Sequence, residues 1–223
     1  MSRIPVYFMP GLAANPLIFE RIKLDDTLFD VHYLEWEIPK PSETLEDYAQ
    51  RIAFHIKEEN PVLIGVSFGG IVVQEMAKHI AVRKLIIISS VKTNLELPKR
   101  IQLVKKTLVY KLIPMRLILS FGKLAQFVFG EKFTHRMQLY EKFLSVRDIS
   151  YLNWAVEKVV SWNCCVVDER VIHIHGNKDR MFPIKHIKKC IVVAGGTHVM
   201  IFTKYRWFNT HLPDIILNEN AKF

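Results

Sequence analysis

The chain has 223 residues, of which 50% are hydrophobic and 24% are charged, as is typical of a single globular domain with or without an inserted subdomain. No apolar run approaches the roughly 18 residues that span a bilayer, and the start "MSRIPVYFMPG" has no long apolar signal region, so we expect a cytoplasmic protein. Three cysteines without CxxC spacing (Cys164, Cys165 and Cys190) argue against a disulfide framework and against a zinc site.

The formal net charge of +9 is concentrated in the middle of the chain. Residues 92–155 hold twelve basic and four acidic side chains, a net charge of +8. Between residues 97 and 130 there are seven basic side chains and no acidic ones (Lys99, Arg100, Lys105, Lys106, Lys111, Arg116 and Lys123). The rest of the chain is therefore close to neutral.

The first ninety residues alternate between strand and helix patterns. We expect strands at 4–8, 30–36, 62–66 and 84–90. One helix is expected to start near Ser42 and Glu43 and to end before Pro61, and a second to run from Phe68 to about Ala81. This alternation predicts an α/β fold, a mostly parallel sheet of about six strands with helices on both faces.

The rhythm changes between residues 92 and 162, which contain no clear strand. Helical patterns occupy 98–114, 114–130, 135–145 and 148–162, the last of them with Asp148 or Ser150 as its cap. A strand pattern returns at 170–176, followed by the segment 182–189, a strand at 190–196 and a last helix at about 199–217. We therefore expect a core of residues 1–91 and 163–223 with a helical, basic insertion at 92–162.

The sequence "GVSFGG" marks the point where the strand at 62–66 meets the following helix. It fits the pattern G-x-S-x-G with Gly65, Ser67 and Gly69, and Gly70 follows. A strand that turns sharply into a helix leaves no room for side chains two positions either side of the corner, and it presents the serine hydroxyl at a helix N-terminus. An ordinary glycine-rich turn or a phosphate-binding loop would also fit the pattern alone.

A serine nucleophile needs a base and a carboxylate that orients the base. His198, in "GGTHVM", and Asp179, in "HGNKDRMFP", each follow a predicted strand, so both belong at the sheet edge that carries Ser67. His198 as a simple helix cap is the alternative. Asp168 is the reserve acid, but it precedes its strand and belongs at the opposite edge.

Acyl transfer also needs hydrogen-bond donors for the oxyanion that forms on the substrate carbonyl. The amide of Phe68, which directly follows the serine, is one candidate. The second is the amide of Leu12, in the loop "MPGLAANP" after the first strand, although this loop would also serve as a plain turn.

With these four motifs, "MPGLAANP", "GVSFGG", "HGNKDRMFP" and "GGTHVM", the chain resembles the α/β-hydrolase-fold serine hydrolases, in particular small lidded esterases. The resemblance extends over nearly the whole chain and implies that residues 92–162 form a lid. The chain differs from the family in having Pro10-Gly11 where His-Gly is frequent. It also begins at the strand that carries the loop "MPGLAANP".

The resemblance implies a serine hydrolase that cleaves a carboxylic ester or thioester of a small or medium acyl group, without metal or organic cofactor. Acyltransferase, lyase and perhydrolase chemistry on the same scaffold, or acyl or lipid binding without catalysis, stay open. The basic insertion is a solvated face or a docking surface for an acidic acyl carrier protein or an anionic membrane surface. No motif indicates nucleic-acid binding, and we expect His173 and His175 to be structural rather than metal ligands.

Overall fold

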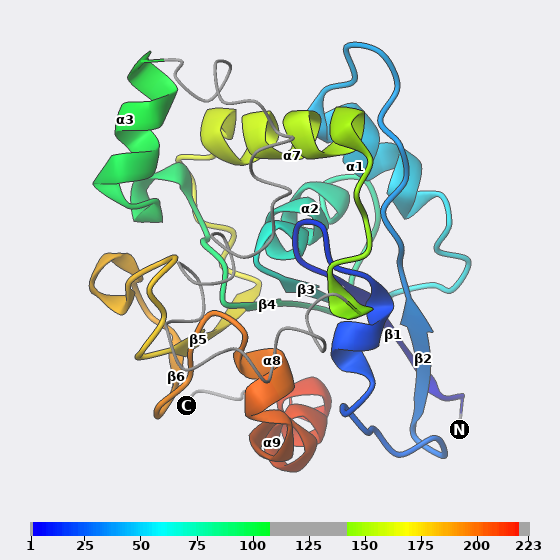
Figure 1. Ribbon diagram of the computed structural model, residues 1–223. Coiled ribbons are helices and arrows are strands. Elements are labelled where there is room, and N and C mark those ends of the chain that lie inside the picture. Colours follow the sequence, from blue (N-terminus) through cyan, green and yellow to red (C-terminus); the bar gives the residue numbers. More distant parts are fainter. Residues whose placement is uncertain (1, 108–141, 219–223) are drawn as a thin grey trace.

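The computed structural model describes residues 2–107 and 142–218. Six strands form a single parallel sheet in the order β2-β1-β3-β4-β5-β6 (Figure 1). The strands are β1 Ile4–Met9, β2 Phe29–Tyr33, β3 Val62–Val66, β4 Lys84–Ile88, β5 Val171–Gly176 and β6 Ile191–Val193. The predicted α/β fold with a six-stranded parallel sheet is therefore confirmed.

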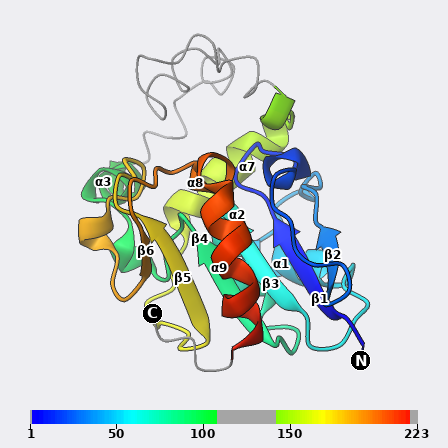
Figure 2. The same ribbon diagram turned by 90° about the horizontal axis from the view of Figure 1, so that it is seen from below.

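Helices cover both faces of this sheet (Figures 1 and 2). The α-helices are α1 Leu45–Ala53, α2 Phe68–Met76, α3 Lys99–Thr107, α7 Ile149–Ser161, α8 Met200–Thr203 and α9 Tyr205–Leu217. Three 3-10 turns are η1 Pro16–Phe19, η2 Asn94–Glu96 and η4 Ile184–His186. Helices α1, α2 and α7 lie on one side of the sheet, and α8 and α9 lie on the other. None of the helices in the two described ranges has the length and apolar character needed to cross a bilayer.

The central strands β3 and β4 alternate between two hydrophobic clusters because successive strand residues point to opposite faces. Leu63 and Leu85 pack with the side chains of α1, α2 and α7, whereas Ile64 and Ile86 pack with those of α8 and α9. Every residue of β3 is buried, which is why this strand shows a continuous apolar run in the sequence.

Helix α1 is shorter than its sequence pattern suggests. It begins at Leu45 rather than near Ser42, because the Thr44 hydroxyl caps it by accepting the Asp47 amide at 3.0 Å. It ends at Ala53, where i+3 hydrogen bonds tighten the last turn, among them His55 N to Ile52 O at 3.0 Å.

Other boundaries differ from expectation as well. Strand β2 ends at Tyr33 rather than at residue 36, β4 ends at Ile88 rather than at residue 90, and β6 covers only Ile191–Val193 of the predicted 190–196. Helix α2 ends at Met76 rather than near Ala81, because i+3 bonds such as His79 N to Met76 O replace the helical ladder. The 182–189 segment forms only the single turn η4, and the closing helix is interrupted at Lys204, which separates α8 from α9.

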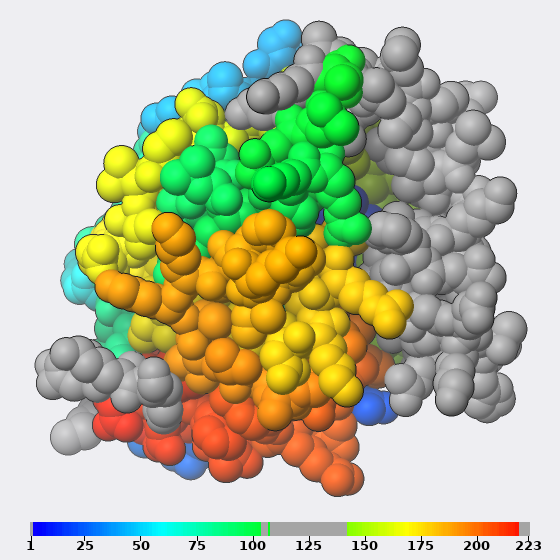
Figure 3. Space-filling model, turned by 90° about the vertical axis from the view of Figure 1, so that its left-hand side faces the viewer, coloured from blue at the N-terminus to red at the C-terminus, as the bar shows by residue number. Residues whose placement is uncertain are grey.

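Two helices of the expected insertion are among the described residues, whereas those expected at 114–130 and 135–145 lie wholly or largely outside them. Asp148 caps α7 by accepting the Tyr151 amide at 2.8 Å. Trp154 of α7 is buried in the cluster of α1 and α2, and its indole donates to the Glu43 carbonyl at 2.8 Å. Helix α3 (green) lies against the segment between β5 and β6 (yellow to orange) in Figure 3, where Arg100 donates to the Arg180 carbonyl at 2.7 Å.

Candidate active site

Four segments that are far apart in the sequence meet at the carboxyl edge of the sheet. Gly11 follows β1, Ser67 follows β3, Asp179 follows β5, and His198 follows β6. In a parallel sheet the carboxyl ends of all strands lie at one edge, so residues just beyond them come together. Because of this topology, the four sequence motifs share one location.

Ser67 occupies a strained corner between β3 and α2. Its φ of 52° and ψ of −119° lie outside the regions that residues with a Cβ normally adopt, at a cost of about 1–3 kcal/mol. Backbone hydrogen bonds maintain this conformation: the Ser67 amide donates to Ile88 O at 2.9 Å, and its carbonyl accepts the Gly70 amide at 2.9 Å. The carbonyl also accepts the Ser90 hydroxyl at 2.7 Å.

The glycines around Ser67 are required by close backbone contacts. A Cβ on Gly65 would overlap the carbonyl of Gly69, and a Cβ on Gly69 would overlap the carbonyl of Pro10. A Cβ on Gly70 would lie 2.6 Å from the Cβ of Ser90. The strand, the helix and the loop after β1 are thus pressed together around the serine.

Ser67, His198 and Asp179 form a continuous hydrogen-bonded row. His198 Nε2 lies 2.9 Å from Ser67 Oγ, and His198 Nδ1 lies 2.9 Å from Asp179 Oδ2. When Nδ1 donates a hydrogen bond to the carboxylate, Nε2 is unprotonated and can accept a hydrogen bond from the serine hydroxyl. Ser67 is partly exposed, and the side chain of His198 is 13% exposed, so the row is open at the serine end.

Asp179 is held rigidly, and it is held as a carboxylate. Burial by itself would raise its pKa, but the opposing effects of His198 and of backbone donors prevail, so the pKa of Asp179 lies below its usual value. The donors are the amides of Met181 and Phe182, at 2.8 and 2.9 Å from Oδ1. The acid is therefore charged at neutral pH and oriented by its own loop.

A pair of histidines on strand β5 lies next to the loop of Asp179. His175 Nε2 donates to the Phe182 carbonyl at 2.8 Å, and His173 Nε2 lies 3.1 Å from His175 Nδ1. Because Nε2 of His175 carries a proton, its Nδ1 accepts and His173 donates. Burial lowers the pKa of both rings, that of His173 most strongly, so both are neutral. They contact each other and the loop of Asp179.

The loop after β1 passes directly beside Ser67. A Cβ placed on Gly11 would be 3.5 Å from the Cβ of Ser67. The Gly11 carbonyl accepts the Trp36 indole at 2.9 Å and the Ala14 amide at 3.0 Å. In a planar trans peptide the next N–H points opposite to the carbonyl, so the Leu12 amide faces away from Trp36. No acceptor within residues 2–107 and 142–218 takes this amide.

Trp36 also contacts the residue that follows the serine. Its ring stacks on Phe68 with centroids 5.1 Å apart and planes 7° apart, so one indole contacts both candidate donor segments. The sequence reasoning did not single out Trp36, although it stands at the end of the predicted strand 30–36 and so at the same sheet edge. Ser90, at the end of the predicted strand 84–90, was missed in the same way.

Other candidate groups have their own partners. Asp168, the reserve acid, forms an ion pair with Arg170 at 2.7 Å. Asp30, His32 and Glu58 bring ligand-type atoms within 4.8 Å of one another. However, Arg3 lies 3.2 Å from Asp30, and the Tyr7 hydroxyl hydrogen-bonds to Glu58, so these carboxylates already have partners.

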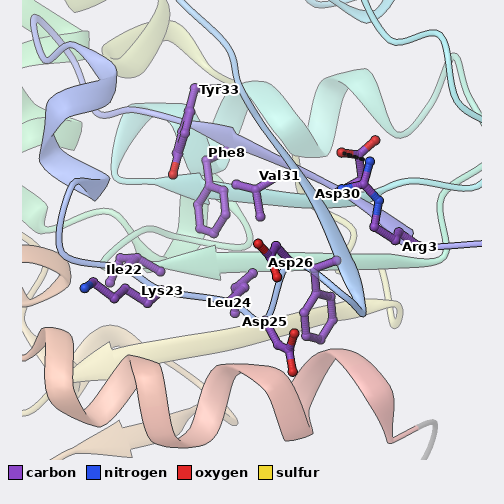
Figure 4. A pocket seen from close by; sticks show the side chains of 11 residues that line it. Arg3, Phe8, Ile22, Lys23, Leu24, Asp25, Asp26, Asp30, Val31 and Tyr33 are labelled. Carbon is purple, nitrogen blue, oxygen red and sulfur yellow. Dashed lines mark ion pairs between the residues drawn. The ribbon is translucent and has the colours of Figure 1, made fainter.

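A hollow of about 610 Å³ lies along β2 and the loop that precedes it (Figure 4). Its apolar side chains include those of Phe8, Ile22, Phe29 and Val31, and Asp25 and Asp26 also line it. Neither Ser67 nor His198 nor Asp179 lines it. This hollow is therefore separate from the row of three residues.

Comparison with known proteins identifies the fold. No family model matches the chain, and no curated protein matches it in sequence. Among solved structures, a hydrolase from Oleispira antarctica matches with a TM-score of 0.74 and 13% identity over 98% of this chain and 93% of its own. A carboxylesterase from Nitrososphaera gargenis matches with a TM-score of 0.65 and 18% identity over 96% and 90%.

An esterase from Thermogutta terrifontis is similar as well, with a TM-score of 0.66 and 13% identity over 96% of this chain and 90% of its own. At such identities the likeness concerns the backbone architecture. The chain has the α/β-hydrolase fold.

The buried histidine pair makes stability sensitive to acid. The pKa of His173 and of His175 is lowered in the folded state. When the pH falls below the usual histidine pKa of 6.5, the two rings therefore bind protons more readily in the unfolded chain than in the folded one. Stability is therefore full above pH 6.5 and falls below it, by up to about 1.4 kcal/mol per pH unit for each ring that stays neutral. Melting temperatures measured from pH 8 to pH 5 should show this decline, and His173→Gln should reduce it. An unchanged slope in that variant would contradict this account.

Proposed function

We propose that this protein is a serine hydrolase that cleaves a carboxylic ester or thioester of a small or medium acyl group. The observation that carries the proposal is the row Ser67–His198–Asp179, with both contacts at 2.9 Å. The strained serine corner and the fold shared with hydrolases and esterases support it. The insertion at 92–162 would serve as the lid, and the reaction would need no metal or organic cofactor.

The first half-reaction acylates the serine. His198 Nε2 takes the proton of Ser67 Oγ as the oxygen attacks the carbonyl carbon of the substrate, and Asp179 stabilises the imidazolium that forms. The amides of Leu12 and Phe68 donate to the oxyanion of the tetrahedral intermediate. His198 then protonates the leaving alcohol or thiol, whose bond to the acyl carbon breaks.

The second half-reaction returns the serine. His198 removes a proton from water, which attacks the acyl-enzyme, and the carboxylic acid leaves as Ser67 Oγ regains its proton. An acyltransferase or perhydrolase would differ only in the nucleophile that replaces water, whereas a lyase or a binding protein would form no acyl-enzyme. Water is the simplest acceptor for a partly exposed serine, so hydrolysis is the reaction we propose.

Covalent labelling tests the nucleophile. A fluorophosphonate probe should label the wild-type protein and fail to label Ser67→Ala, because the phosphonyl group requires the activated oxygen. The control is Ser89→Ala, since Ser89 also has a positive φ at a strand end, where its hydroxyl has no partner in the described part of the chain. That variant should still be labelled. A folded wild-type protein that resists the probe would instead indicate a binding protein.

Replacement of the acid tests the orientation of the base. In Asp179→Asn the amide would donate to His198 Nδ1, so that Nε2 carries the proton and faces Ser67. We expect kcat on p-nitrophenyl acetate to fall by about 10³–10⁴-fold. Asp168→Asn, which removes the acid that pairs with Arg170, should stay within about twofold of wild type. Equal losses in the two variants would reject Asp179 as the orienting acid.

Salt dependence tests whether the basic insertion attracts an acidic acyl carrier protein or another anionic surface. Steering by long-range charge weakens as ionic strength rises, whereas turnover of a small neutral ester does not depend on it. We therefore expect kcat/KM for a carrier-linked thioester to fall between low and high salt while kcat/KM for p-nitrophenyl acetate stays constant. Parallel behaviour of both substrates would leave the basic segment as a solvated face.

A further inference from the structure

The loop after β1 is attached to a distant segment of the chain. Residues 142–151, which lead into the first turn of α7, run alongside residues 13–15 and form five hydrogen bonds with them. Two of these bonds are between backbones: Asn15 N donates to Phe143 O at 2.8 Å, and Val146 N donates to Ala13 O at 3.2 Å. We call residues 142–151 the clamp segment.

Side chains contribute the other three bonds. The amide nitrogen of the Asn15 side chain donates to the carbonyl of Lys142 and to the hydroxyl of Ser145, both at 2.8 Å. The Tyr151 hydroxyl accepts the backbone amide of Ala13 at 3.3 Å. Ala13 has a φ of 63°, a left-handed conformation that is uncommon for a residue with a Cβ and that needs support from its surroundings.

The clamp segment is anchored on both sides of the sheet. Phe143 is buried at one end of it and contacts Phe202 of α8 with ring centroids 4.8 Å apart. Tyr151 is buried at the other end and contacts Trp36 with centroids 5.2 Å apart. A loop bonded five times to a segment with two buried anchors has little freedom to move.

We infer that the clamp segment positions residues 10–15, the loop after β1 that carries the Leu12 amide and that we call the oxyanion loop, with Tyr151 and Asn15 as positioning residues for this amide. This inference rests on the proposed function. Trp36 and the Ala14 amide hold the Gly11 carbonyl on one side of Leu12, and the clamp segment holds Ala13 and Asn15 on the other. The orientation of the Leu12 amide is then determined from both directions.

The physical reason is preorganisation. A donor stabilises an oxyanion best when it already points at the place where the charge develops, because no reorganisation is then needed during the reaction. A donor that is free to move loses part of this effect. Small displacements lower the reaction rate even when they originate far from the reacting atoms. Loosening the clamp segment should therefore weaken transition-state binding while substrate binding stays the same.

Two near-isosteric variants loosen the clamp segment, and each has a matched control. Tyr151→Phe removes the hydroxyl that accepts the Ala13 amide. Tyr48→Phe removes a hydroxyl from the same aromatic cluster, which among residues 2–107 and 142–218 bonds only to Glu37. Asn15→Asp removes the side-chain donor but keeps the oxygen that accepts the Leu17 amide.

The control for Asn15→Asp is Asn209→Asp. The side chain of Asn209 also accepts one backbone amide, from Lys23, and donates to one carbonyl, that of Arg21, each at 3.0 Å. Both asparagines are half-buried, so the two substitutions change the same chemistry at different places.

The measurements are the rate of fluorophosphonate labelling, kcat and KM for p-nitrophenyl acetate, and inhibition by phenylboronic acid. The boronic acid forms a tetrahedral anionic adduct with the serine and so reports on the oxyanion site. In Tyr151→Phe and Asn15→Asp we expect labelling and kcat to fall about tenfold, KM to stay constant and the boronate inhibition constant to rise in parallel. The controls should remain within about twofold of wild type.

The outcomes separate this inference from the proposed function. If wild type is labelled but Tyr151→Phe and Asn15→Asp behave like their controls, the clamp segment does not position the oxyanion loop, although the hydrolase proposal holds. If KM rises while kcat and boronate binding are unchanged, the clamp segment affects substrate binding instead, and the inference is wrong. If folded wild type is not labelled, the proposed function fails and the inference fails with it.

Discussion

The strained backbone at Ser67 is the constraint on which the rest of the site depends. A residue with φ of 52° and ψ of −119° does not persist unless its surroundings hold it there. Here the Ile88 carbonyl at the end of β4 accepts a hydrogen bond from the Ser67 amide. The Ser90 hydroxyl and the Gly70 amide in the first turn of α2 donate hydrogen bonds to the Ser67 carbonyl. The corner therefore needs β3, β4 and α2 in close contact, which requires glycine at Gly65 and Gly70. Gly69 is required because the loop after β1 presses its Pro10 carbonyl against the same turn.

Hydrogen bonds from several segments also hold Asp179. Asp179 accepts hydrogen bonds from the amides of Met181 and Phe182 and from Nδ1 of His198. The Phe182 carbonyl in turn accepts a hydrogen bond from His175 of β5. Asp179, its loop and His198 are thus parts of one hydrogen-bonded unit. Burial without these donors would favour the protonated acid, so it is the donors that allow a charge to be kept inside the protein.

The loop after β1 is held in a different way. It has positive φ at Ala13, and its position depends on hydrogen bonds to Trp36 and to the clamp segment. Tyr151 and Trp154 of α7 pack in the same aromatic cluster as Trp36 and Phe68. Helix α7 is in this way continuous with the hydrophobic cluster beside the serine.

The parallel sheet and the approximate strand positions were predictable, because buried strands leave continuous apolar runs and topology places the residues that follow them at one edge. Ser67, Asp179 and His198 could be named for the same reason. Helix ends were predicted less well: α1 and α2 stop early where i+3 bonds replace the helical ladder, and the pattern of apolar residues does not report that change.

The sequence by itself determined which side chains carry the proposed chemistry and which sheet edge they occupy, since both follow from motif and strand order. Only the tertiary structure decided what holds them. Ser90, Trp36, His175 and the clamp segment act through contacts between residues that are 7 to 138 positions apart. Such contacts leave no periodic pattern or motif in the chain, because they depend on how the layers pack rather than on local sequence.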